Sequence, residues 1–104
     1  MKRIAFRMKL KPGAAAEYAR RHEAIWPELK ALLKEAGISD YSIFLDEETG
    51  TLFAVQKNAG EVGSQDLGRN EVVQRWWAYM KDLMETNPDN SPQSVPLKEV
   101  FHLD

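Results

Sequence analysis

The fold of this chain is decided by residues 41–56, YSIFLDEETGTLFAVQ. Apolar side chains recur along both halves of this stretch, and the short connection EETG at 47–50 ends in glycine. Two alternating runs joined in this way are typical of an antiparallel β-hairpin, so we expect strands at 41–46 and 51–56. Large apolar side chains occur on both faces of the hairpin: Ile43, Leu52, Phe44 and Phe53.

A strand and a long helical segment precede the hairpin. Residues 4–10 alternate apolar and other side chains, which predicts a strand with one buried face. Residues 14–36 carry apolar side chains at helical spacing, and Gly37 is well placed as the C-terminal cap. Pro27 lies inside this segment, where it removes a backbone donor and crowds the preceding turn. We therefore expect a kink or break near residues 25–26.

A loop, a second helix and a last strand follow the hairpin. Residues 58–68 hold three glycines and few apolar side chains, which favours a mobile loop with a weak helical turn at most. Apolar residues recur at helical spacing over 70–84, a loop rich in proline and short polar residues follows at 87–92, and we expect the last strand at 97–103.

The order strand, helix, strand, strand, helix, strand is the split βαβ pattern of a ferredoxin-like α+β domain. Such a domain has a four-stranded antiparallel sheet with both helices on one face. Residues 1–104 have room for one domain of this kind. Because the other face of the sheet stays uncovered, we expect it to be buried against a second copy, which makes a homodimer.

Composition excludes several classes of partner and cofactor. The 14 basic and 16 acidic residues are interspersed and give a net charge of −2, so no nucleic-acid partner is expected. The chain has no cysteine, which excludes disulfides, thiolate metal sites and a cysteine nucleophile. The two histidines have no acidic residues at metal-ligand spacing, and no glycine-rich phosphate loop is present, so neither a metal nor a nucleotide cofactor is expected.

Targeting and membrane signals are also missing from the sequence. The N-terminal residues MKRIAFR alternate apolar with basic and lack the apolar run of a signal peptide. No stretch approaches the ~20 apolar residues that a membrane span needs. We therefore expect a soluble, cytoplasmic protein with no membrane partner.

His22 occupies a position where a core leucine would be expected. At helical spacing it shares one stripe with apolar and aromatic residues: Tyr18, Ile25, Leu29 and Leu32. Imidazole has a reference pKa of about 6.5, so a ring at this position can give or take a proton near neutrality. The alternative is a hydrogen-bonded core histidine without a chemical role. His102 is expected to face the opposite side of the last strand from its neighbours and to have no catalytic role.

Aromatic side chains are expected to line a cavity between the helices and the sheet. Tyr18, Tyr41 and Trp77 point there, and Trp76 lies at the edge of the stripe that contains Trp77, where it covers a ligand from the side or meets the loop at 87–92. Indole, phenol and imidazole groups suit a small polyhydroxylated ligand. The alternative is a core that is simply rich in aromatic residues.

Five separated motifs together resemble the L-rhamnose mutarotases. They are YARRH at 18–22, IWPEL at 25–29, Asp40-Tyr41, QRWW at 74–77 and NPDNSP at 87–92. The resemblance covers essentially the whole chain, and the motifs lie in order. It implies a cofactor-free enzyme with a dimeric α+β barrel fold that interconverts the α and β anomers of L-rhamnose. The segment at 58–68 departs most from the family pattern.

The resemblance also implies roles for individual residues. The position that matches His22 is the proton donor, and those that match Tyr18, Tyr41, Trp76 and Trp77 bind the sugar. The base that partners His22 stays open among Tyr18, Tyr41, an acidic residue of the loop at 87–92, and water. Two other functions fit the same fold: a cofactor-free oxygenase of the dimeric α+β barrel type, and a non-catalytic sugar-binding dimer.

Overall fold

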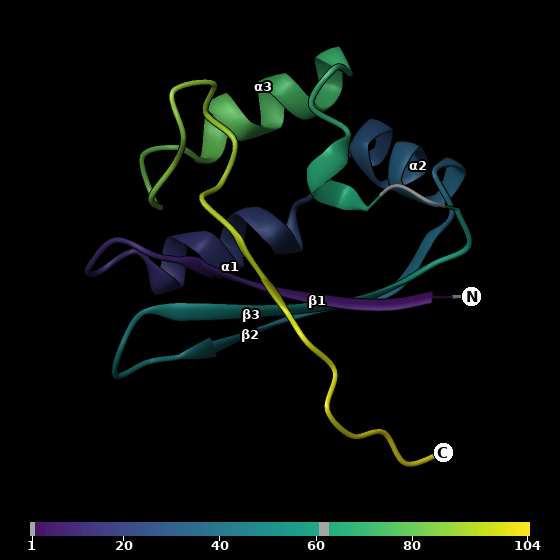
Figure 1. Cartoon of the computed structure of the whole chain (residues 1–104). Coiled ribbons are helices and arrows are strands. Elements are labelled where there is room, and N and C mark those ends of the chain that lie inside the picture. Colours follow the sequence, from purple (N-terminus) through teal and green to yellow (C-terminus); the bar gives the residue numbers. More distant parts are fainter. Residues whose placement is uncertain (1, 61–62) are drawn as a thin grey trace.

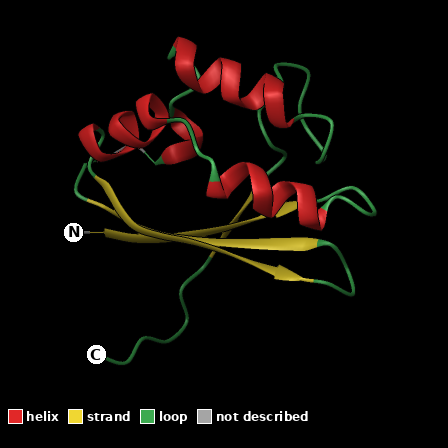
Figure 2. Cartoon of the chain, turned by 180° about the vertical axis from the view of Figure 1, so that it is seen from behind, coloured by secondary structure: helices red, strands yellow, loops and turns green. Residues whose placement is uncertain are grey.

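The computed structural model of the chain describes residues 2–60 and 63–104. Its elements, drawn in Figure 1, are β1 (Lys2–Lys9), α1 (Ala15–Glu23), α2 (Pro27–Glu35), β2 (Ile38–Asp46), β3 (Thr51–Asn58), the 3₁₀ turn η1 (Ser64–Asp66), α3 (Glu71–Met80) and β4 (Val95–Leu97). The strands form one four-stranded sheet in the order β2-β3-β1-β4, and all its pairings are antiparallel. Figure 2 shows the helices on one face of this sheet. The expected α+β fold is therefore confirmed.

The long helical segment is broken where its proline predicts a break. α1 ends at Glu23, and α2 begins at Pro27, the first position of a helix, where a missing N–H costs nothing. Trp26 precedes it with an extended backbone. Gly37 follows α2 with a φ of +86°, a left-handed conformation that glycine adopts without strain.

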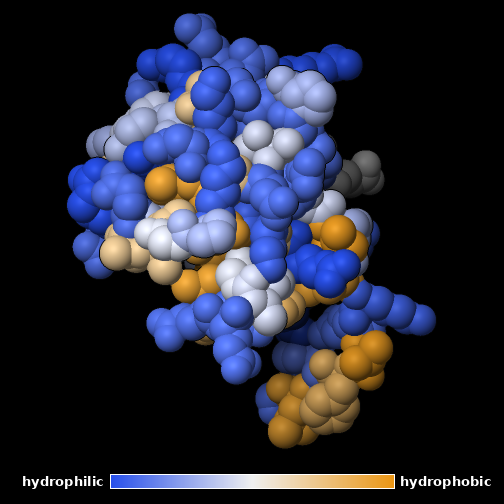
Figure 3. All heavy atoms as spheres, turned by 90° about the vertical axis from the view of Figure 1, so that its left-hand side faces the viewer, coloured by the Kyte–Doolittle hydropathy of each residue, from blue (hydrophilic) through white to orange (hydrophobic). Residues whose placement is uncertain are grey.

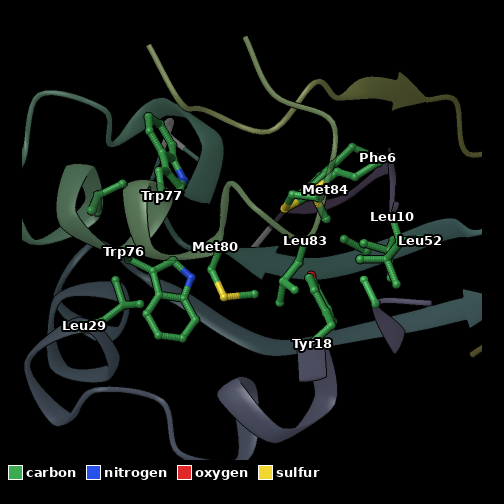
Figure 4. Close-up of a cluster of buried hydrophobic side chains, with 14 residues drawn as sticks. Phe6, Leu10, Tyr18, Leu29, Leu52, Trp76, Trp77, Met80, Leu83 and Met84 are labelled. Atoms are coloured by element: carbon green, nitrogen blue, oxygen red, sulfur yellow. The ribbon is translucent and has the colours of Figure 1, made fainter. Parts of the chain in front are cut away.

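Alternation along the central strands sets the two faces of the sheet. On β3, Leu52, Ala54, Gln56 and Asn58 are buried under the helices, and on β1 the buried residues of this face are Phe6 and Met8. The apolar residues among them pack with Tyr18, Leu29 and the apolar side of α3 into one core, which Figure 4 shows. The hairpin pairs Phe44 with Phe53 on the opposite face, as its alternation predicts.

The last strand is shorter than expected, and it starts earlier. β4 spans only Val95–Leu97, and residues 98–104 have no regular secondary structure, so the strand expected at 97–103 is wrong. The apolar side chains of this segment are largely exposed: Val100, Phe101 and Leu103. Because these side chains stay exposed in the single chain, their burial does not stabilise further pairing with β1. Without a strand, His102 does not alternate with its neighbours, and its Nε2 lies 3.0 Å from Arg3 Nη2 and 3.1 Å from Asp104 Oδ1.

The last helix ends earlier than the sequence predicts. The helix expected at 70–84 ends at Met80, although Leu83 and Met84 remain buried beyond it. Asn70 caps this helix by accepting a hydrogen bond from the Val72 N–H at 2.8 Å. The weak turn expected within 58–68 is present as η1, and residues 61 and 62 of that segment lie outside the described residues.

The face of the sheet away from the helices is open to solvent, and apolar side chains share it with basic ones such as Arg7, which pairs with Phe53. Phe44 is 63% exposed there, and Phe53 is 38% exposed. Figure 3 shows the apolar C-terminal segment standing apart from the body of the molecule. Among the described residues, no helix has the length and apolar character needed to cross a membrane.

Candidate active site

A cavity of about 730 Å³ lies between the helices and the covered face of the sheet. Small-molecule sites in proteins commonly measure about 300–1,000 Å³. Its lining includes all five candidate side chains from the sequence: Tyr18, His22, Tyr41, Trp76 and Trp77. Residues from three elements, α1, β2 and α3, thus meet because the helices cover the same face of the sheet.

His22 lies in the last turn of α1, where its ring packs among aromatic groups. The ring centroid lies 4.4 Å from that of Tyr18 and 5.5 Å from that of Trp76, with the Trp76 contact edge-on. His22 Nδ1 is 3.0 Å from the backbone oxygen of Tyr18. Since a carbonyl oxygen only accepts, Nδ1 carries a hydrogen and Nε2 is the nitrogen left for a ligand. Burial lowers the pKa of His22, which favours the neutral ring.

Tyr18 and Tyr41 both present buried phenol groups. Burial raises the pKa of Tyr18, and the neighbouring Tyr41 raises it further. Burial also raises the pKa of Tyr41, while a hydrogen bond from Ser64 lowers it slightly. Both groups are therefore neutral near pH 7 and act as hydroxyl donors rather than as phenolate bases.

Trp76 and Trp77 point to different sides of α3 (Figure 4). Trp76 lies against His22 and also contacts Trp26 and Tyr79, with ring centroids 5.1 and 5.7 Å away. It is as buried as Trp77, with 8% and 7% of their surfaces exposed. Trp76, expected at the edge of the helix stripe, is therefore buried there as deeply as Trp77 is within the stripe. The reason is that α1 and α2 pack beside α3 and cover the flank that a single-helix projection leaves open.

Trp77 packs closely against the backbone at Gly68. A Cβ atom at that position would lie 2.9 Å from Trp77 Cζ3, which is too close for an ordinary contact. Glycine at this position therefore lets the loop approach the indole ring.

Polar residues that the sequence analysis did not single out lie next to the aromatic groups. Ser64 and Gln65 of η1 line the cavity, and the buried Gln56 of β3 bonds to Ser64. Gln65 Oε1 is buried and has no hydrogen-bond partner within residues 2–60 and 63–104. Alternation from Leu52 along β3 already places Gln56 on the covered face, so this residue could have been found from the sequence.

Acidic residues line the cavity at different positions from those that the sequence suggested. Asp89, in the loop at 87–92, is exposed, and its carboxylate accepts hydrogen bonds from Ser91 that lower its pKa. The acids that do line the cavity are Glu23 and Asp40. Within the described part of the chain, no group of three or more histidine and acidic side chains is arranged to hold a metal ion.

Comparisons with known proteins identify one family over almost the whole chain. A sequence model of a family described as L-rhamnose mutarotase matches residues 3–103. An L-rhamnose mutarotase of Bacteroides thetaiotaomicron is 68% identical over 104 residues, and one of Phocaeicola vulgatus is 61% identical, with both chains covered completely in each case. A crystal structure of the L-rhamnose mutarotase from Formosa agariphila superposes with a TM-score of 0.93 at 55% identity and full coverage of both chains.

Proposed function

The chain belongs to the L-rhamnose mutarotase family, and on that premise we propose that its aromatic cavity binds L-rhamnose and interconverts the α and β anomers. The observation that carries the proposal is the placement of His22 beside Tyr18 and Trp76 on the cavity. A titratable ring among aromatic groups fits an isomerase that moves protons on a sugar. Neither an oxygenase nor a non-catalytic sugar-binding protein is favoured by these relatives.

Mutarotation requires proton transfer at two oxygens of the sugar. The anomeric hydroxyl loses a proton while the bond from the anomeric carbon to the ring oxygen breaks, and the ring oxygen gains a proton. The open chain then rotates about the bond next to the carbonyl carbon, and closure from the other face reverses both transfers. A positioned acid or base contributes about 10²- to 10⁴-fold to such a reaction.

His22 is the group that we assign to the anomeric hydroxyl. Its neutral ring accepts the hydroxyl proton at Nε2 during opening, because Nδ1–H is held by the Tyr18 carbonyl. The resulting imidazolium returns the proton to the carbonyl oxygen during closure. The family resemblance implies a proton donor at this position. In the present assignment His22 donates only when the ring closes, because burial lowers its pKa and favours the neutral ring before opening.

The remaining groups bind the sugar and stabilise the opened ring. The neutral hydroxyls of Tyr18 and Tyr41 donate hydrogen bonds toward sugar oxygens. The hydroxyl that bonds to the ring oxygen gives that oxygen its proton as the ring opens and takes it back on closure. The indoles of Trp76 and Trp77 pack on the apolar faces of the sugar. L-Rhamnose carries a methyl group where most hexoses carry a hydroxymethyl, and the apolar side chains of the cavity suit that methyl.

Exchange NMR on equilibrated L-rhamnose tests the proposal directly. We expect micromolar protein to accelerate exchange between the α and β anomeric signals without a cofactor. If the protein binds L-rhamnose but anomer exchange is no faster than in buffer alone, the protein is a sugar-binding protein and not a mutarotase. Oxygen uptake with an aromatic substrate would favour an oxygenase.

The pH profile of catalysed exchange checks the role of His22. We expect kcat/KM to rise with pH through the His22 pKa, which burial places below 6.5, and then to level off because the neutral ring is the accepting form. Tyr18 and Tyr41 keep their protons throughout this range. The measurement is exchange NMR from pH 4.5 to 8.5 with the buffer rate subtracted. A rate that falls as pH rises through that pKa would make the imidazolium the reacting form in opening.

We further propose that the chain is a homodimer joined through the open sheet face. Phe44 and Phe53 pair there, and both are exposed in the single chain. A monomer of this size gains from burying such a surface. A stable interface of this kind buries at least ~1,200 Å² in total.

Light scattering on the purified protein and two variants tests the dimer. We expect twice the chain mass at micromolar concentration for the unaltered protein and for Ala78→Asp, which places the same charge on the exposed helix layer. Phe44→Asp is expected to give a monomer, because it would bury a carboxylate in an apolar interface. A monomer before any substitution would contradict the proposal.

A further inference from the structure

A buried hydrogen-bond chain leads from the interior of the sheet to Tyr41. Gln56 is 0% exposed and Ser64 is 7% exposed. The Ser64 backbone N–H donates to Gln56 Oε1 at 3.0 Å, and Gln56 Nε2 donates to Ser64 Oγ at 2.9 Å. Ser64 Oγ in turn lies 3.4 Å from the Tyr41 hydroxyl oxygen. These hydrogen bonds link β3, η1 and β2.

The direction of each of these hydrogen bonds follows from the bond between the Ser64 backbone N–H and Gln56. A backbone N–H can only donate, so the Gln56 atom that faces it is the carbonyl oxygen, and the amide nitrogen faces Ser64 Oγ. Gln65 Nε2 also approaches that oxygen, at 3.4 Å. Ser64 Oγ therefore accepts from amide groups, and its own hydrogen points to Tyr41. Tyr41 Oη accepts that hydrogen, which leaves the Tyr41 hydrogen for the cavity.

We propose that Gln56 and Ser64 are positioning residues that hold the Tyr41 hydroxyl as a hydrogen-bond donor toward the ring oxygen of the bound sugar. A hydroxyl that is free to rotate both donates and accepts, whereas this one is fixed as a donor before the sugar arrives. The ring oxygen has no hydrogen of its own and only accepts, and it gains negative charge as the ring opens. A donor fixed in advance stabilises that charge without rearrangement. The inference rests on the proposed function.

A double-mutant cycle between Ser64 and Tyr41 tests the proposal. We expect Tyr41→Phe to lower kcat/KM for anomer exchange about 100-fold, in line with the loss of one preorganised donor. Ser64→Ala, which frees the Tyr41 hydroxyl to rotate, is expected to lower it about 10-fold. The double variant should lose about 100-fold, because Ser64 acts only through the Tyr41 hydroxyl.

Independent effects would multiply to about 1,000-fold in the double variant, and that result would overturn the proposal. A Ser64→Ala protein with unaltered kcat/KM would do the same. Should Ser64→Ala not fold, Ser64→Cys keeps nearly the same volume but supplies only a weak donor, and the same cycle applies. Ser94→Ala, at an exposed serine outside the cavity, is the matched control with unchanged kinetics. Absence of exchange in the unaltered protein would instead reject the proposed function, and this inference with it.

Discussion

His22→Ala is expected to lower the rate of catalysed anomer exchange by about 10²- to 10⁴-fold, the usual contribution of one positioned acid or base. The loss follows because His22 Nε2 is the nitrogen left for the sugar once Nδ1 bonds to the Tyr18 carbonyl. The fold should survive, since the side chain is only partly buried and lies beside the cavity. The measurement is exchange NMR on L-rhamnose, with circular dichroism to check the fold.

The chain supplies its own matched control for this experiment. His102 is the only other histidine, and it is exposed in the C-terminal segment beside Arg3. His102→Ala should therefore keep full activity. A folded His22→Ala protein that exchanges anomers at nearly the normal rate would return His22 to a purely structural role.

Trp76→Ala is expected to lower both stability and activity. Removal of a buried tryptophan costs about 3–5 kcal/mol of unfolding free energy in many cores. The indole also holds the edge-on contact with His22, so its loss frees the imidazole to move and should lower kcat. Thermal melts report the first effect, and exchange kinetics on the folded fraction report the second.

Comparison with Trp77→Ala separates the loss of core packing from the loss of the contact that holds the His22 ring in place. Trp77 is equally buried but packs toward Gly68, so its removal should cost similar stability and raise KM more than it lowers kcat. Trp76→Phe retains a ring beside His22 and should recover part of kcat. If Trp77→Ala lowers kcat as strongly as Trp76→Ala does, the contact with His22 does not account for the effect.

Sequence patterns that span only a few residues predict most of the fold. Alternation over 41–56 predicts the hairpin and both of its faces, and Pro27 predicts the break between α1 and α2. These features depend on residues close in sequence, because strand alternation and the missing proline N–H act within a few residues. The candidate residues Tyr18 and His22 also followed from local spacing on one helix.

The sequence by itself therefore determined the order of the elements, the covered face of the sheet and the helix stripe that carries His22. Only the tertiary structure decided which flank of α3 is covered, because α1 and α2 bury Trp76 from a direction that one helix pattern does not contain. It also joined Gln56, Ser64 and Tyr41, whose hydrogen bonds depend on three elements that pack together. The end of β4 at Leu97 likewise depends on the apolar surface available to residues 98–104, which is a property of the assembled fold and not of local pattern.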